Sequence, residues 1–134
     1  MSKVEGKGKL PDEWLKQADY DMETARAMFA GRRYIYTVFM CHLSIEKALK
    51  GLYQTQTGEM PPKTHNLVFL VEKIGLKLPE EMYDRIFELS RISIPTRYPD
   101  DLEKMKREYK REVTEKTLQE SEGTLLWIKQ QYQK

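Results

Sequence analysis

The sequence predicts an all-α protein, an up-and-down bundle of four or five helices. Apolar residues recur at steps of three and four along most of the chain, which is the period of a helix that buries one face. No segment alternates apolar and polar residues with the period of a strand. The prolines fall between the periodic segments, where helices end. At 134 residues, the chain has the size of one domain with a single core.

The first two helices are expected at residues 12–30 and 34–57. Pro11 suits a position just outside the first turn, and Gly31 supplies a stop. Gly58, followed by two prolines, ends the second helix. The apolar stripe of the first helix is Leu15, Ala18, Met22, Ala25 and Phe29. The stripe of the second is Ile35, Val38, His42, Ile45, Leu49 and Leu52.

A short third helix and a fourth helix follow. Thr64 is the expected N-cap of the third, and Gly75 closes it. Pro79 opens the fourth, which is expected to run to about Ile92. Residues 93–101, SIPTRYPDD, contain two prolines and are predicted to form an irregular turn.

A charged helical segment is predicted from about Asp101 to the C-terminus. The pattern leaves open whether it is continuous or broken near residues 110–114. Residues 100–122 mix acids and bases, which favours a solvated helix face. The alternative is a partner-binding surface, and the mixed signs argue against nucleic acid there. Gly123 interrupts the helix and suggests close helix packing at that position. The apolar stripe near the C-terminus is Leu118, Leu125, Ile128 and Tyr132.

The composition bounds the class of protein. No apolar run approaches the roughly 20 residues that span a bilayer, and no secretory signal is visible, so we expect a cytoplasmic protein without membrane contact. The single cysteine, Cys41, excludes an intramolecular disulfide. A net charge of +2 is too small to indicate nucleic-acid binding by itself. Residues 1–11 are predicted to be a flexible basic tail, and residues 12–134 the helical domain.

The second helix carries a polar seam in the segment CHLSIEKALKGL. His42 lies on the apolar stripe, and Glu46 and Lys50 follow at successive turns, where their side chains can meet. His42 is interpreted as a core histidine that needs a hydrogen-bond partner. For Glu46 and Lys50, an intrahelical ion pair and a functional role both remain open. With His65 as the only other histidine, no metal-ligand motif is present, and neither a metal nor a cofactor is predicted.

The turn around Arg97 and Tyr98 is a second candidate site. Two flanking prolines, Pro95 and Pro99, restrict the backbone that presents these side chains. A guanidinium beside an aromatic ring suits the recognition of phosphates and bases. The alternative is that Arg97 caps a helix or pairs with a nearby aspartate while Tyr98 covers the core.

Four segments of the chain together resemble the HEPN family (higher eukaryotes and prokaryotes nucleotide-binding domains). They are WLKQADYDMETARAMF, YTVFMCHLSIEKALKGLY, PPKTHNLVFLVEKIG and the TRYPDD turn. Glu46, Lys47 and Lys50 and the stretch 62–67 carry the signature. The resemblance implies a compact helical bundle, commonly a homodimer, which often partners a separately encoded minimal nucleotidyltransferase in toxin–antitoxin pairs.

Many HEPN members are metal-independent ribonucleases with an arginine and a following histidine that are separated by four to six residues. This sequence departs from that motif, because Leu102, Glu103 and Lys104 stand at the relevant spacing after Arg97. His65 could take the place of the missing histidine only if the fold brought it near Arg97. No catalytic residue is therefore assigned from the sequence.

Three hypotheses follow. The preferred one is a nucleotide- or RNA-binding module that partners a nucleotidyltransferase, rather than an enzyme. The second is a metal-independent endoribonuclease toxin, and the third is a purely structural helical interaction domain. The candidate nucleotide- or RNA-binding residues are Arg97, Tyr98, Glu46, Lys47, Lys50 and His65.

Overall fold

The protein is all-helical over the part of the chain that the computed structural model describes, residues 10–133. The helices are α1 (Pro11–Ala30), α2 (Tyr34–Thr57), α3 (Leu67–Ile74), α4 (Glu80–Arg91), α5 (Ser93–Arg97), α6 (Leu102–Glu108) and α7 (Arg111–Gln131). The predicted class is thus correct, but the expected four or five helices become seven within these residues. No helix in this range is long and apolar enough to cross a membrane.

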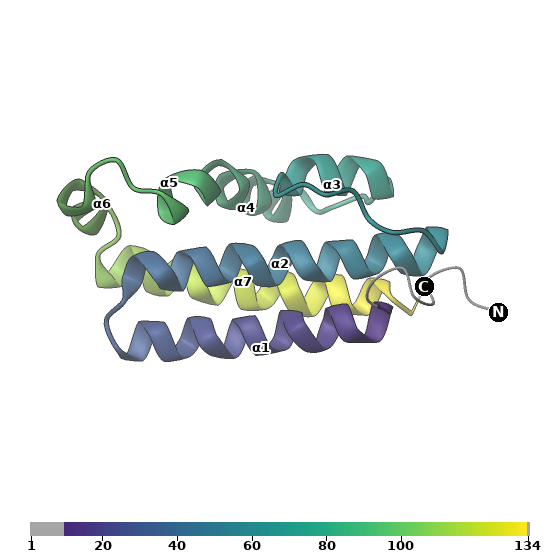
Figure 1. Ribbon diagram of the computed structural model, residues 1–134, viewed down its shortest axis with the longest axis horizontal. Coiled ribbons are helices and arrows are strands. Elements are labelled where there is room, and N and C mark those ends of the chain that lie inside the picture. Colours follow the sequence, from purple (N-terminus) through teal and green to yellow (C-terminus); the bar gives the residue numbers. More distant parts are fainter. Residues whose placement is uncertain (1–9, 134) are drawn as a thin grey trace.

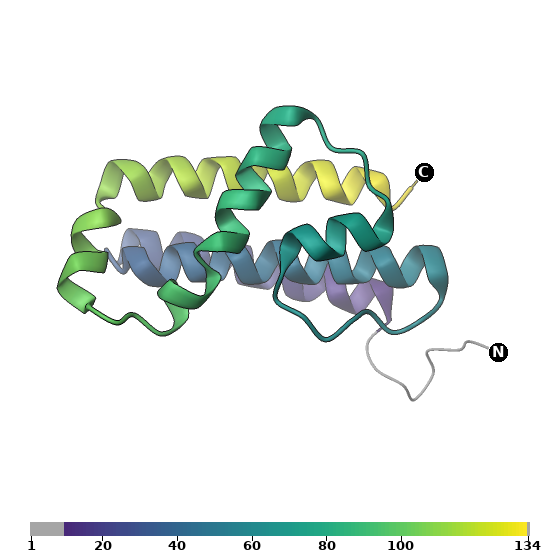
Figure 2. The ribbon, with the colours of Figure 1, turned by 90° about the horizontal axis from the view of Figure 1, so that it is seen from above.

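Three long helices, α1, α2 and α7, lie side by side along the molecule, and the short helices α3 to α6 form a second layer over them (Figure 1). Seen from above, α4 crosses the long helices obliquely while α3 follows α2 (Figure 2). Helix α2 contacts all six other helices. Because α2 is surrounded in this way, polar groups on its faces must find partners in other elements.

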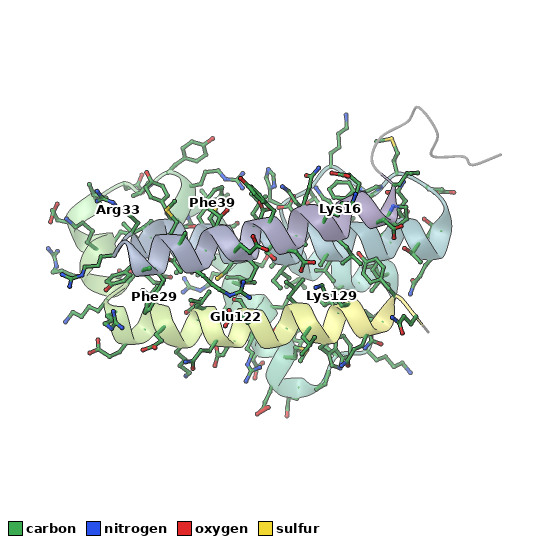
Figure 3. The ribbon with its side chains drawn as sticks, turned by 90° about the horizontal axis from the view of Figure 1, so that it is seen from below. Lys16, Phe29, Arg33, Phe39, Glu122 and Lys129 are labelled. Carbon is green, nitrogen blue, oxygen red and sulfur yellow. The ribbon has the colours of Figure 1, made fainter. Side chains whose placement is uncertain are left out.

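The apolar stripe of α2 forms the centre of the core. All six predicted stripe residues, His42 included, are buried, and the bounds predicted for this helix agree with the structure. The stripe of α1 contributes Ala18, Met22 and Ala25, with Leu15 and Phe29 packed against the core from its edge. The α1–α7 contact also contains an ion pair in which Lys129 Nζ lies 2.6 Å from Asp19 Oδ1, and a second joins Arg26 and Glu122 (Figure 3).

Several local predictions need correction. Pro11 lies in the first turn of α1, where its missing N–H would have no partner anyway, so this helix begins one residue earlier than predicted. The predicted tail at residues 1–9 lies outside the described residues. The N-cap of α3 is Asn66, whose Oδ1 accepts a hydrogen bond from the Phe69 N–H at 3.0 Å. The Thr64 hydroxyl instead accepts from the Asn66 N–H, just before the helix.

The segments after α4 differ most from the expectation. The predicted irregular turn contains α5, and the charged segment breaks between α6 and α7 at Tyr109 and Lys110. The Tyr109 side chain is buried at this break and packs into the core. Gly123 is exposed, and apart from its chain neighbours and the backbone of its own helix no atom lies within 4 Å of the position that a Cβ would take. The predicted close packing at Gly123 is therefore wrong.

Candidate functional site

Glu46 is the centre of a buried polar cluster on α2. Its Oε2 accepts a hydrogen bond from Lys50 Nζ at 2.9 Å, one turn along the same helix. Its Oε1 accepts a second bond, also of 2.9 Å, from Nδ1 of His65 in the α2–α3 loop. Glu46 and Lys50 are at most 9% exposed, so each charge depends on the other for compensation.

His42 is a buried histidine with one internal partner. Its Nε2 lies 2.9 Å from the main-chain carbonyl oxygen of His65, and because a carbonyl only accepts, Nε2 is the donor. Its Nδ1 is buried without a hydrogen-bond partner, and the 3.8 Å to Glu46 Oε1 is too long for one. The prediction of a core histidine that needs a partner is confirmed.

The charge state of His42 follows from its surroundings. Burial lowers its pKa, and the electrostatic influence of Arg97 and His65 lowers it further, whereas Glu46 and the His65 carbonyl act in the opposite direction. The net effect is a lowered pKa, so His42 is neutral near pH 7 and holds its proton on Nε2. A fully buried neutral histidine with this fixed hydrogen bond is a structural group and not a proton shuttle.

His65 is fixed to α2 at two points. Its carbonyl accepts from His42, and its imidazole donates from Nδ1 to Glu46. The side chain is nevertheless 56% exposed, so the ring stands at the rim of the cluster with Nε2 unpaired among residues 10–133. A carboxylate that orients an exposed imidazole leaves the second ring nitrogen available as a base or a hydrogen-bond acceptor.

The side chains of Arg97 and Tyr98 lie in different environments, although the two residues are adjacent in the chain. The Arg97 guanidinium lies over the Phe39 ring of α2, with Cζ 5.0 Å from the ring centre. No acid within residues 10–133 pairs with it, which argues against the expected alternative of an aspartate partner. Tyr98 is 71% exposed and does not cover the core. Phe39 was not predicted as a site residue, because an aromatic residue beside the apolar stripe of a helix usually indicates core packing.

Lys47 does not belong to the polar cluster around Glu46. It follows Glu46 in sequence, but the turn of the helix directs it toward α1, where its Nζ lies 2.9 Å from Asp21 Oδ2. Four of the six candidate residues, Glu46, Lys50, His65 and Arg97, therefore lie on the face of α2 under α3 and α5. Lys47 lies on the α1 side of the helix, and Tyr98 is exposed. Spacing in the helix predicted the Glu46–Lys50 pair. No spacing rule could have predicted that His65 reaches Glu46, because a loop of irregular shape brings it there.

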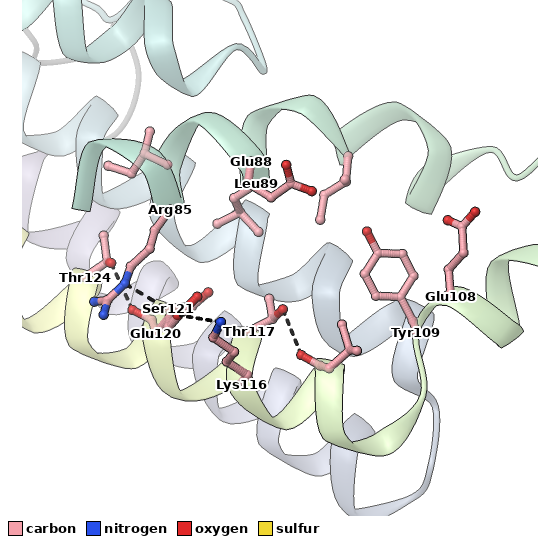
Figure 4. Close-up of a pocket in the computed structure, with 13 residues that line it drawn as sticks. Arg85, Glu88, Leu89, Glu108, Tyr109, Lys116, Thr117, Glu120, Ser121 and Thr124 are labelled. Atoms are coloured by element: carbon pink, nitrogen blue, oxygen red, sulfur yellow. Dashed lines mark hydrogen bonds and ion pairs between the residues drawn. The ribbon is translucent and has the colours of Figure 1, made fainter. Parts of the chain in front are cut away.

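A separate hollow of about 360 Å³ lies between α4 and α7 (Figure 4). Its charges are balanced, since Glu120 Oε2 lies 3.7 Å from Arg85 Nε and 3.9 Å from Lys116 Nζ. The described part of the chain contains no group of three or more side chains that could hold a metal ion.

Comparisons with known proteins agree with this architecture. TT1696 from Thermus thermophilus has a crystal structure with a TM-score of 0.80 and 25% sequence identity, covering 90% of this chain and 97% of that one. ST0689, an archaeal HEPN homologue, gives a TM-score of 0.76 at 28% identity, covering 93% and 99%. No curated protein sequence matches this chain. The model of the HEPN domain matches residues 11–131, almost the whole helical unit. The chain is therefore a member of the HEPN domain family.

Proposed function

We propose that this protein is a nucleotide- or RNA-binding HEPN module whose binding surface contains His65, Arg97 and Tyr98. The observation that carries the proposal is that His65, from the α2–α3 loop, is hydrogen-bonded to His42, while Arg97, from α5, lies over Phe39, one helical turn before His42 on α2. Two segments more than 30 residues apart thus meet over one turn of α2.

The charge of this cluster favours an anionic ligand. Lys50 and Glu46 compensate each other, so the positive charge of Arg97 remains in excess. The guanidinium is placed by a ring instead of an acid, so it does not have to exchange a protein partner for a ligand. Guanidinium groups bind phosphate through charge-assisted hydrogen bonds.

Tyr98 supplies the feature that distinguishes a nucleotide from a simple anion. It follows Arg97 directly, and its ring is mostly exposed. Stacking of a base on such a ring contributes about 1–3 kcal/mol and tolerates any base. In this proposal Arg97, the last residue of α5, contacts a phosphate, and Tyr98, directly after it, contacts the base.

Fluorescence anisotropy with labelled single-stranded RNA and with labelled ATP tests this proposal. Arg97→Ala is expected to weaken binding about tenfold, which corresponds to roughly 1.4 kcal/mol. Tyr98→Ala is expected to weaken it by a similar factor. Lys16→Ala, which removes an exposed cation of α1, is the matched control and should bind as the wild type does. Equal affinities for all four proteins would refute the assignment of the site.

The proposal includes two kinds of protein partner. Family membership supports a homodimer and a minimal nucleotidyltransferase as the partner. A native mass near 32 kDa, twice the 15.9 kDa of one chain, is expected in light scattering. Co-purification with a nucleotidyltransferase encoded by a neighbouring gene tests the second partner. A monomer that retains no such enzyme would refute this part of the proposal.

One observation favours a second candidate function, metal-independent RNA cleavage. Glu46 orients His65 so that Nε2 could accept the proton of a ribose 2′-hydroxyl. The 2′-oxygen would then attack phosphorus, the bond to the 5′-oxygen would break with a proton from water, and a 2′,3′-cyclic phosphate would form. Arg97 would stabilise the charge on the phosphoryl oxygens.

Labelled RNA in excess chelator separates this activity from binding. Cleavage that disappears in both His65→Ala and Arg97→Ala would support it. No cyclic-phosphate product across several RNAs, from protein that binds them normally, would exclude the enzyme and leave the binding module in place.

A further inference from the structure

A second cavity, of about 520 Å³, lies at the end of the bundle where the α1–α2 turn faces the α6–α7 break. Half of its ten lining residues are cations and none is an acid. The cations are Arg32, Arg33, Lys106, Lys110 and Arg111. Three of them come from the charged segment 100–122, whose mixed signs argued against a nucleic-acid surface. Folding brings these bases to the cavity without the acids between them.

The positive charge of this cavity is hardly compensated. Lys106 lies 3.8 Å from Glu103, in an exposed pair that contributes little. Arg32, Arg33, Lys110 and Arg111 form no ion pair with any acid of residues 10–133. Five like charges around one cavity repel each other, and a bound anion would relieve that repulsion. The hollow between α4 and α7 differs, because its cations have carboxylate partners.

The backbone conformation at position 32 of the α1–α2 turn favours glycine, so the arginine found there indicates a role for its side chain. Arg32 has φ 62°, the left-handed conformation in which glycine is favoured. Its neighbour Gly31 has an ordinary φ of −85° and makes no use of its freedom. Two hydrogen bonds hold the turn, from the Arg32 N–H to Phe29 O at 3.0 Å and from the Arg33 N–H to Met28 O at 2.8 Å. Glycine at position 32 would form the same turn with less strain.

Arg111 on the opposite wall is also held in place. Its guanidinium lies over the Phe29 ring, with Cζ 4.9 Å from the ring centre, and Phe29 in turn packs against Tyr34. Figure 3 shows Phe29 and Arg33 at the same end of the bundle. Arg111 is the first residue of α7, and Lys110 before it provides no side-chain cap. The free N–H groups of this first turn add to the positive potential.

The cavity also offers an aromatic surface. Tyr36 lines it and is 57% exposed. A ligand that covers the tyrosine ring would remove apolar surface from water and gain binding free energy. Tyr36 lies one helical turn before Phe39, the residue whose ring contacts the Arg97 guanidinium. The cavity is therefore a neighbour of the His65–Arg97 surface along α2, but it shares no residue with it.

We propose that this cavity is a binding site for phosphate groups that carry a planar base, as a free nucleotide or as part of a single RNA strand. Cations from the α1–α2 turn, α6 and the start of α7 would contact the phosphates, and Tyr36 would contact the base. The site is independent of the function proposed above, because its lining includes neither Arg97 nor His65.

Isothermal titration with pyrophosphate, ADP and a ten-nucleotide single-stranded RNA tests the site. The main variant is Arg32→Gly, which relieves the strained backbone and removes one cation. Its melting temperature should equal or exceed that of the wild type, while its affinity for ADP or RNA falls at least fivefold. Lys110→Ala, at an exposed position without an ion pair, should show the same loss of affinity and serves as a second variant. Lys16→Ala is the matched control and should leave affinity unchanged.

The ligands separate the two sources of phosphate. Weakened ADP binding in Arg32→Gly and Lys110→Ala identifies a nucleotide site, and pyrophosphate alone should then bind more weakly than ADP. A loss seen only with RNA, together with a shallower salt dependence, identifies a strand. If both variants bind every ligand as the wild type does, the cavity is not a binding site. A loss confined to Arg97→Ala would likewise overturn this proposal while it supports the other surface.

Discussion

His42→Gln removes a titrating group from the core and keeps its hydrogen bond. The glutamine amide nitrogen can donate to the His65 carbonyl as Nε2 of His42 does, but it takes up no proton between pH 5 and 8. His42→Leu removes the donor as well and leaves the carbonyl unpaired in the core, at a cost of about 1–3 kcal/mol. The two variants together separate the hydrogen bond from the protonation equilibrium.

The pH dependence follows from the direction of the pKa shift. Burial lowers the pKa of His42 in the folded protein from its ordinary value of 6.5. Below that value the unfolded chain binds a proton that the folded protein refuses, so acidification favours unfolding. Integrating the linkage from neutral pH to pH 5.5 gives at most about 1.4 kcal/mol for one such group. Stability is therefore lost as the pH falls below about 6.5.

Urea unfolding at pH 8.0 and pH 5.5 measures this term. The free energy of unfolding of the wild type should fall by up to about 1.4 kcal/mol more than that of His42→Gln, because all other groups titrate alike in both. His42→Leu should lack the extra loss too, but should be less stable at both pH values. Equal losses in wild type and His42→Gln would refute the argument that the folded protein keeps His42 neutral.

Three further predictions concern packing and burial. Gly51→Ala should lower stability by about 1–3 kcal/mol, because its Cβ would lie 2.2 Å from Tyr132 Oη and 2.7 Å from Trp14 Cβ; an unchanged melting temperature would contradict this packing. Gly123→Ala should do the reverse and add about 0.5–1 kcal/mol, since its Cβ would meet no atom within 4 Å apart from its chain neighbours and the nearby backbone of α7; a lower melting temperature would count against the structure there. Burial raises the pKa of Cys41 to about 12, so a thiol reagent at pH 8 should modify Cys41 only as fast as the protein opens; rapid modification of native protein would show that the thiol is accessible.

Sequence reasoning succeeded where a single periodic pattern decides the structure. The bounds of α2 and its buried stripe follow from the helical period and from the stop at Gly58, which adopts the left-handed conformation. Reasoning failed at α5 because Pro95 was taken to exclude a helix. Pro95 is the third residue of α5, and in the first turn of a helix the N–H groups have no intrahelical partner to lose.

The break between α6 and α7 could not be decided from sequence, because neither glycine nor proline marks it. Tyr109 ends α6 with a non-helical ψ of 67° and buries its ring, so tertiary packing decides the backbone there. The basic cavity depends on that break, since the three bases from this segment reach it only when the chain turns between the two helices. A local charge pattern therefore cannot show which bases the fold brings together.

Two variants separate the two roles that the polar seam could have, which are ligand binding and the positioning of the α2–α3 loop. The main chain of His65 is held by His42, whereas its imidazole is held by Glu46. His65→Ala therefore keeps the main-chain bond that fixes the loop, but it removes the ring together with the hydrogen bond that the ring donates to Glu46. Glu46→Gln does the opposite, because it leaves the ring present but deprives the buried Lys50 of its counter-charge. If RNA binding falls in His65→Ala at unchanged stability, the seam serves a ligand; if only Glu46→Gln has an effect, and that effect is on stability, the seam serves the register of the loop on α2.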